Sequence, residues 1–140
     1  MAERLDLAEA LNRHQFVLLD TCVLINEVHG CSSVLGTINR PQRRASVLCL
    51  WEFTHGEAGA HLKRLEAVRR REWLADQGII VVNLAGNCCQ SFRSLECDEA
   101  APPSAVDCLL AAEALARGWP LVTCNDKHFN GVPGLRLIAI

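Results

Sequence analysis

Short runs of consecutive apolar residues recur along the chain and alternate with longer stretches of mixed polarity. Continuous apolar runs of this kind are typical of strands that are buried on both faces of a parallel sheet. The runs cover residues 16–19, 79–82, 121–123 and 135–138. Because helix-like stretches separate them, the pattern predicts an α/β domain with a largely parallel sheet and right-handed crossovers.

Two of the intervening stretches have defined helix starts and ends. Ser46 is expected to cap a helix that runs to about His55. The tripeptide Pro102-Pro103-Ser104 predicts the start of an alanine- and leucine-rich helix over 105–117, which Gly118 ends.

The remaining helices rest on periodicity and composition. Residues 57–77 predict a long polar helix with four apolar side chains directed toward the core. These side chains are Leu62, Leu65, Val68 and Leu74. Shorter helices are expected over 3–13, 21–28 and 85–99, whereas residues 31–45 favour no single element.

The composition is that of a folded domain. The 140 residues are 50% hydrophobic and 21% charged, which provides enough apolar material for a core of ordinary size. A net charge of −2 excludes the binding of polyanions by bulk charge alone. No apolar stretch approaches the roughly 20 residues that a membrane span needs.

The eight cysteines do not follow the pattern of a secreted disulfide scaffold. Most lie in apolar runs, where cysteine behaves as a small buried hydrophobe, and no paired CxxC motif predicts a zinc site. The first twelve residues carry four charged side chains where a secretion signal needs an apolar segment. We therefore expect a reducing, cytoplasmic location.

Basic residues gather in two groups. Arg40, Arg43 and Arg44 form the first group, and Lys63 and Arg64 begin a second that continues to residue 71. One interpretation is a basic face beside an acidic pocket, which would hold a polyanion. The other is two solvated surfaces, and these residues alone favour it.

Polar residues follow the predicted strands at the points where ligands bind to parallel sheets. Asp20 comes directly after the first apolar run, and Asn125 and Asp126 follow the run that ends at residue 123. Asp107 lies in the first turn of the helix after residue 104, and Glu52 lies within an otherwise apolar helix. These side chains are therefore candidates for one site.

Each of them also has an ordinary structural explanation. Asp20 could cap the following helix, Asp107 could favour a helix dipole, and Asp126 could be a turn residue. Glu52 is harder to explain, because a carboxylate among apolar neighbours needs a partner.

Taken together, converging carboxylates repel each other unless a cation lies among them. Oxygen ligands without a set of His or Cys side chains select hard cations such as Mg²⁺ or Mn²⁺. Such ions generate a hydroxide nucleophile and stabilise charge on a phosphodiester.

Four segments in order resemble the sequence motifs of the PIN-domain nucleases. They are residues 16–25, 46–53, 104–112 and 120–129, and residues 132–138 also resemble the family's last strand. The resemblance implies that Asp20, Glu52 and Asp107 are the three acidic metal ligands.

The fourth position of the implied site is open between two residues. Many relatives place Asp two residues after a Thr, whereas this chain has Asn125 there and Asp126 next. Asn125 could orient a water molecule, and Asp126 could reach the metal after a small shift of the turn. Thr21 and Thr123 match hydroxyls that support the carboxylates through hydrogen bonds.

Two further positions depart from the family pattern. Cys22 replaces a common Asn and is expected to subtract a hydrogen bond from the site. His128 stands where relatives often carry Asp, and we interpret it as a turn histidine.

The resemblance also implies a fold and an activity. The fold is a three-layer α/β/α sandwich with about four to five mostly parallel strands, in a single PIN-like domain over 1–140. The N-terminal helical extension over 1–15 departs from the family, because many relatives begin almost at the first strand. The activity is metal-dependent cleavage of single-stranded RNA, in the manner of the VapC-type toxins of toxin–antitoxin pairs. Implied partners are RNA, a small antitoxin and a second copy of the chain. The RNA backbone would lie on Arg40, Arg43, Arg44, Lys63 and Arg64.

Three alternatives stay open. The chain could be a housekeeping RNA-processing nuclease, or a non-catalytic PIN-like binding module. It could also be a phosphotransfer enzyme with Asp20 as nucleophile, although that class repeats an Asp where this chain has Cys22.

Overall fold

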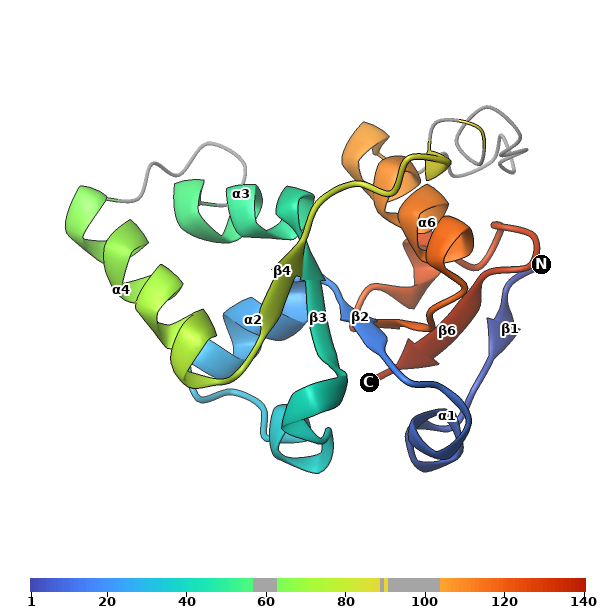
Figure 1. The fold of residues 1–140 in the computed structure, drawn as a ribbon, viewed down its shortest axis with the longest axis horizontal. Coiled ribbons are helices and arrows are strands. Elements are labelled where there is room, and N and C mark those ends of the chain that lie inside the picture. Colours follow the sequence, from blue (N-terminus) through green and yellow to red (C-terminus); the bar gives the residue numbers. More distant parts are fainter. Residues whose placement is uncertain (57–62, 89, 91–103) are drawn as a thin grey trace.

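The structure, a computed structural model, describes residues 1–56, 63–88, 90 and 104–140 and is built around one parallel β-sheet (Figure 1). Its strands lie in the order β1-β6-β5-β2-β3-β4, and every neighbouring pair is parallel. The strands are β1 (Glu3–Arg4), β2 (Val17–Leu19), β3 (Arg43–Ser46), β4 (Ile80–Val82), β5 (Leu121–Thr123) and β6 (Arg136–Ala139). The predicted α/β class with a parallel sheet is confirmed.

Helices cover both faces of the sheet. Figure 1 shows α2, α3 and α4 on one side and α6 on the other, which is the predicted three-layer arrangement. The described helices are α1 (Leu7–Arg13), α2 (Thr21–Val28), α3 (Val47–His55), α4 (Arg64–Asp76) and α6 (Ala105–Arg117). Short 3₁₀ turns are η1 (Val34–Thr37), η2 (Arg40–Gln42) and η3 (Asp126–His128).

The strand order reverses beside β2. From β2 the chain moves outward through β3 to β4 and then returns through α6 to β5, which pairs with the other edge of β2. Right-handed crossovers in opposite directions place the intervening helices on opposite faces. A crevice therefore opens at the carboxyl ends of β2 and β5, where parallel sheets bind ligands.

The two strands beside this crevice are fully buried. Every residue of β2 and of β5 is inaccessible to solvent, as expected for continuous apolar runs in the centre of a parallel sheet. Close packing on both faces fixes the positions of the turns that follow these strands. The functional side chains on those turns are consequently carried on a rigid base.

The sheet has two more strands than the four apolar runs indicate. The added strand β3 lies in the ambiguous stretch 31–45 and extends one residue past it, and its sequence Arg-Arg-Ala-Ser contains no apolar run. The added strand β1 pairs only two residues with β6, within a stretch that was predicted as helix. Only the later part of that stretch is helical, with Asp6 as the cap of α1.

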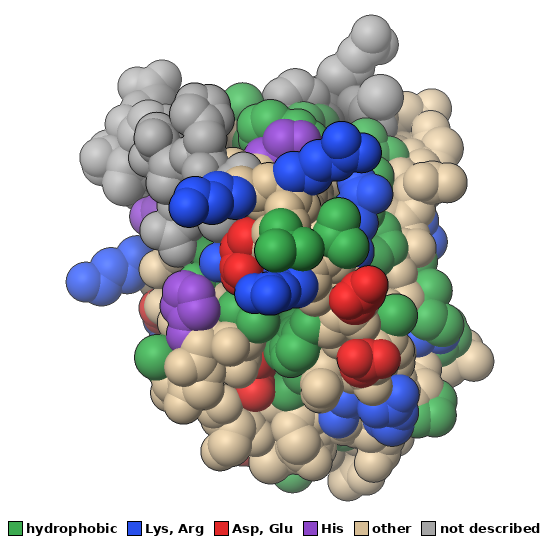
Figure 2. All heavy atoms as spheres, turned by 90° about the vertical axis from the view of Figure 1, so that its left-hand side faces the viewer, with side chains coloured by type: hydrophobic (Ala, Val, Ile, Leu, Met, Phe, Trp, Pro, Cys, Tyr) green, Lys and Arg blue, Asp and Glu red, His purple; other side chains and the backbone are tan. Residues whose placement is uncertain are grey.

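Two predictions of burial are wrong. Ile80 is 52% exposed because β4 forms the edge of the sheet. On α4, Leu65 and Val68 are 62% and 44% exposed, whereas Arg70 and Leu74 are buried. The helix packs on α3 through Arg70, which donates to the carbonyl oxygen of residue 53, so its other side faces solvent. Figure 2 views this side and shows hydrophobic side chains between Lys and Arg side chains.

The predicted ends of two helices are confirmed. Ser46 Oγ accepts from the backbone N–H of Leu48 at 3.2 Å, and Ser104 Oγ accepts from that of Asp107 at 3.1 Å. Gly118 follows α6 with a φ of 67°, the left-handed conformation that glycine adopts most easily. Most of the helix predicted over 85–99, and Leu62 with its neighbours 57–61, lie outside the described residues. None of the described helices is long and apolar enough to span a bilayer.

Candidate functional site

A pocket of about 310 Å³ lies at the carboxyl ends of β2 and β5. Its walls come from the turn between β2 and α2, from α3, from the start of α6 and from the turn after β5. The residues that line it are Asp20, Thr21, Cys22, Ile25, Glu52, Ser104, Asp107, Asn125 and His128. The three acidic residues that the sequence singled out are thus brought together, although 87 residues separate the first from the last.

Asp20 is the most buried carboxylate of the pocket, with 5% of its surface exposed. Its Oδ1 accepts from the backbone N–H of Thr21 at 2.7 Å, and its Oδ2 accepts from the Thr123 hydroxyl at 2.7 Å. Burial raises the pKa of Asp20, the hydrogen bonds with Thr123 and Thr21 oppose the rise, and the charge of Asp107 adds to it. Asp20 does cap α2, but this role leaves a charged group facing other carboxylates.

Glu52 is held by one hydrogen bond across the pocket. The Thr21 hydroxyl donates to its Oε1 at 2.9 Å, which supplies the partner that the sequence required. Burial raises the pKa of Glu52, and the charges of Asp20 and Asp107 raise it further. The side chain is nevertheless only partly buried, so it stays accessible from the pocket.

Asp107 lies opposite, in the first turn of α6. Its Oδ2 accepts from Nδ1 of His128 at 2.9 Å. The prediction that His128 is a turn residue is correct for its backbone, which lies in η3, but it missed that the ring reaches the pocket. The sequence signal that could have indicated this is its place in the fourth motif, where relatives often carry Asp.

Of the two candidates for the fourth polar group of the site, Asn125 lies at the pocket. This residue lines the pocket, and its backbone N–H donates to the Thr123 hydroxyl at 3.0 Å. Asp126 pairs instead with Arg4 of β1 and is not part of the pocket wall. The structure therefore holds the Asp126 carboxylate away from the pocket, on the N-terminal segment, and its contact with a metal after a shift of the turn stays a prediction.

The donors of the pocket fit a hard divalent cation in chemical type. Three carboxylates and one amide supply oxygen ligands, and the negative charge of Asp107 adds to the raised pKa of both Asp20 and Glu52. As they stand, no three His, Cys, Asp or Glu side chains of the described residues are grouped closely enough to form a ready-made metal site.

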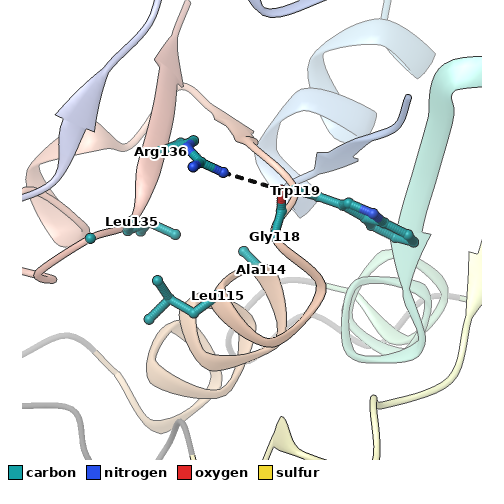
Figure 3. A pocket seen from close by; sticks show the side chains of 7 residues that line it. Ala114, Leu115, Gly118, Trp119, Leu135 and Arg136 are labelled. Atoms are coloured by element: carbon teal, nitrogen blue, oxygen red, sulfur yellow. Dashed lines mark hydrogen bonds between the residues drawn. The ribbon is translucent and has the colours of Figure 1, made fainter. Parts of the chain in front are cut away.

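A second pocket, of about 250 Å³, lies at the other end of α6 and differs in character. Figure 3 shows its walls, from which Arg136 extends toward the carbonyl oxygen of Gly118 at 3.4 Å. The residues that line it are Ala114, Leu115, Gly118, Trp119, Gly134, Leu135 and Arg136. No carboxylate lines it, so the acidic pocket is the candidate for metal chemistry.

Comparison with known proteins identifies the family. The family model described as "PIN domain" matches residues 17–135, which is most of the chain. The chain belongs to the PIN-domain family. The match includes Asp20, Glu52, Asp107 and Asn125. No curated protein matches this PIN domain in sequence.

Solved structures with the same fold include chains of toxin–antitoxin complexes. One is VapBC2 from Rickettsia felis bound to a DNA fragment from its promoter, with a TM-score of 0.75, 19% identity, and coverage of 89% of this PIN domain and 98% of that chain. VapBC-5 from Mycobacterium tuberculosis has a TM-score of 0.66 and 20% identity, and the match covers 91% of this PIN domain and 100% of that chain. A toxin–antitoxin complex from Klebsiella pneumoniae has a TM-score of 0.65 and 24% identity, and the match covers 85% of this PIN domain and 94% of that chain.

Cys22 makes hydrogen bonds within the site of this PIN domain. Its thiol donates to Asp20 Oδ2 at 3.5 Å and accepts from the backbone N–H of Cys124 at 3.3 Å. Burial raises the pKa of the Cys22 thiol, and the charge of Asp20 adds to this, so the thiol stays protonated. The expected loss of a hydrogen bond relative to the common Asn stays a prediction.

The first basic group does not face the pocket. Arg43 is 6% exposed and donates to the carbonyl oxygens of residues 35, 38 and 77 at 2.6–3.0 Å. Arg40 donates to the carbonyl oxygen of residue 76 at 2.8 Å, and Arg44 lies over the Phe16 ring. All three are at the amino end of β3, opposite the pocket, so the structure does not bring them beside the carboxylates, and their contact with RNA stays a prediction. Lys63 and Arg64 are exposed at the start of α4.

The repulsion among the carboxylates of the pocket predicts that Glu52→Gln and the wild type differ in stability, and that this difference depends on pH. A raised carboxyl pKa means that the folded protein is most favoured below the ordinary values, 3.8 for Asp and 4.5 for Glu, and loses stability as pH rises through the shifted values. Glu52→Gln keeps the acceptor for Thr21 and removes one charge. In EDTA at pH 8 this variant is expected to melt above the wild type, by about 2–4 °C for each kcal/mol of repulsion removed.

Calorimetric melting at pH 8 and at pH 4 measures this effect. The difference is expected to shrink at the lower pH, because the raised pKa of Glu52 keeps its carboxyl mostly protonated below the ordinary value of 4.5. Glu72→Gln, an exposed position on α4, is the matched control and should leave the melting temperature unchanged. A Glu52→Gln protein that melted below the wild type at pH 8 would contradict the repulsion.

Proposed function

We propose that the chain is a metal-dependent endoribonuclease that hydrolyses phosphodiester bonds of single-stranded RNA, as the toxin of a type II toxin–antitoxin pair. The observation that supports it best is the convergence of Asp20, Glu52 and Asp107 on one pocket at the strand-order reversal. Membership of the PIN-domain family supports the same reaction class.

Asp20, Glu52 and Asp107 would hold Mg²⁺ or Mn²⁺, with Asn125 as the fourth polar group. When bound, such a cation activates water and offsets the charge of a phosphodiester. The carboxylates also repel a polyanion until their own charge is balanced, so the proposal requires that RNA binding at the pocket depends on the cation.

The hydroxyl groups of the pocket orient the carboxylates. The Thr123 hydroxyl donates to one oxygen of Asp20 and the backbone N–H of Thr21 donates to the other, while the Thr21 hydroxyl donates to one oxygen of Glu52. Each bond lies next to a buried strand end, so it costs little conformational freedom. These contacts leave the other Glu52 oxygen for a ligand, and His128 fixes Asp107 from the facing turn. Lys63 and Arg64 remain the exposed basic residues that would contact the RNA backbone.

The toxin proposal is supported by the solved structures with the same fold. They include chains from VapBC toxin–antitoxin complexes. We accordingly propose a small antitoxin as partner, a homodimer as the assembly and the cytoplasm as the location.

A non-catalytic PIN-like binding module is the alternative that one observation favours, namely that the described carboxylates do not form a ready-made three-ligand group. Calorimetry with Mn²⁺ separates the two. Binding that Asp20→Asn removes supports the nuclease, and its absence in the wild type supports the binding module.

The toxin proposal predicts growth arrest. Induced expression of the wild-type chain in a bacterial host is expected to stop growth, while Asp20→Asn, expressed to the same level, is expected to permit it. An adjacent small reading frame, co-expressed, should restore growth if it encodes the antitoxin. Normal growth with the wild-type chain, at a level confirmed by immunoblot and with nuclease activity shown in the lysate, would instead point to a housekeeping nuclease.

A further inference from the structure

Trp51 is a large aromatic side chain on the surface of α3, next to the acidic pocket. It is 60% exposed. The other two tryptophans are packed: Trp73 lies against Phe53, and Trp119 lies edge-on to Phe16. Full burial of an aromatic side chain stabilises a fold strongly, so the exposed indole does not contribute its full potential to this fold.

The Trp51 ring is held in place by His55, one helical turn later. The two rings stack with centroids 5.3 Å apart and planes inclined by 21°. Nδ1 of His55 donates to the carbonyl oxygen of Trp51 at 2.9 Å and lies 3.2 Å from the Thr54 hydroxyl. The imidazole is therefore fixed to the helix and supports the indole, which reduces the entropy cost of binding a ligand on it.

Its position on the helix places Trp51 next to a residue of the pocket wall. Trp51 directly precedes Glu52, and successive residues of an α-helix point about 100° apart. Glu52 lines the pocket, so Trp51 lies beside the pocket rather than inside it. A ligand whose phosphate enters the pocket would pass its neighbouring unit over this side of α3.

The chemistry of an exposed indole complements that of the pocket. Carboxylates repel a nucleic acid backbone, whereas an aromatic face attracts any unpaired base by stacking, without regard to sequence. A base within a duplex is already stacked and cannot lie on the ring. The combination of an acidic pocket and an adjacent exposed aromatic pair thus fits an unpaired nucleotide.

We propose that Trp51, supported by His55, is a stacking platform for one unpaired base of the RNA, next to the phosphate that is cut. The inference rests on the proposed function and extends it by naming a residue that selects single-stranded substrate. Trp51 acts through the base and not on the reacting atoms, so it governs binding of the strand rather than the chemistry.

The test measures RNA binding separately from cleavage. Stopped-flow fluorescence anisotropy with Mg²⁺ follows a short labelled single-stranded RNA before it is cleaved, which gives the Kd with every proposed metal ligand in place. Trp51→Ala is expected to raise this Kd by about 5- to 100-fold, the range for loss of one base–aromatic stack. Trp51→Phe should retain most of the affinity, because a ring remains. Leu65→Ala removes an equally exposed apolar side chain from α4 and should change nothing.

A scan with abasic nucleotides identifies the stacked base. Removing the base at one position is expected to weaken binding to the protein that carries Trp51. The same removal should not weaken binding to Trp51→Ala further, because two groups in contact have non-additive effects. Annealing the RNA to its complement should weaken binding by the Trp51 protein more than binding by Trp51→Ala.

Three results would overturn the inference while leaving the proposed function intact. The first is equal RNA affinity with and without the indole. The second is a loss that is the same at every abasic position. The third is unchanged RNA binding with an altered sedimentation coefficient, which would assign Trp51 to a protein contact. If the wild-type chain neither bound nor cleaved single-stranded RNA with Mg²⁺ or Mn²⁺, the proposed function itself would fail.

Discussion

Asp20→Asn is expected to abolish metal-dependent RNA cleavage, lowering the rate by at least about 100-fold while the protein stays folded. Loss of an outer-sphere partner already costs about 10- to 100-fold, and Asp20 stands at the centre of the carboxylate group. Asparagine keeps one acceptor oxygen for the N–H of Thr21, so the cap of α2 persists. The measurement is the initial rate of cleavage with Mg²⁺, together with a circular dichroism melt.

Two further variants make this result specific. Asp107→Asn should fail in the same way, because it faces Asp20 across the pocket. Asp126→Asn is the matched control and should keep its activity, because its partner is Arg4, outside the pocket. Full activity in Asp20→Asn, or an equal loss in Asp126→Asn, would contradict the assignment of the site.

Arg43→Met is expected to destabilise the protein by about 3–5 kcal/mol, a large part of the stability of an ordinary domain. The guanidinium group is buried and donates to three carbonyl oxygens that join β3 to the η1 region and to the end of α4. Methionine fills similar space but leaves these acceptors unpaired. Urea denaturation followed by tryptophan fluorescence measures the change.

Arg64→Met tests whether position decides the effect. This residue is exposed at the start of α4, so its loss should change stability by no more than about 0.5 kcal/mol. Its expected effect is on RNA affinity instead. If Arg43→Met unfolded at the wild-type urea concentration and bound RNA more weakly, Arg43 would belong to the RNA interface after all.

The parts of the fold that could be predicted are those with a local signal. Continuous apolar runs predicted β2, β5 and β6, and capping serines with a terminal glycine predicted the ends of α3 and α6. The strand β3 has no such signal. Its first residue is buried through hydrogen bonds with distant carbonyl groups, which no pattern of hydrophobic positions can reveal.

The site divides along the same line. Asp20, Glu52 and Asp107 could be predicted, because each lies at a recognisable point of an element and together they follow the order of a family pattern. That Asn125 lines the pocket and Asp126 does not could not be predicted, because the position of Asp126 depends on Arg4, which is 122 residues away in the sequence. The exposure of Trp51 was also hidden, since apolar neighbours in the sequence suggested burial.

Incubation of the purified wild-type chain with a defined single-stranded RNA, with Mg²⁺ or Mn²⁺ and in parallel with EDTA, tests the central claim most directly. The carboxylate pocket predicts cleavage products with the metal, none with EDTA, and none from Asp20→Asn under either condition. Cleavage that persisted in EDTA, or that Asp20→Asn supported at the wild-type rate, would contradict it.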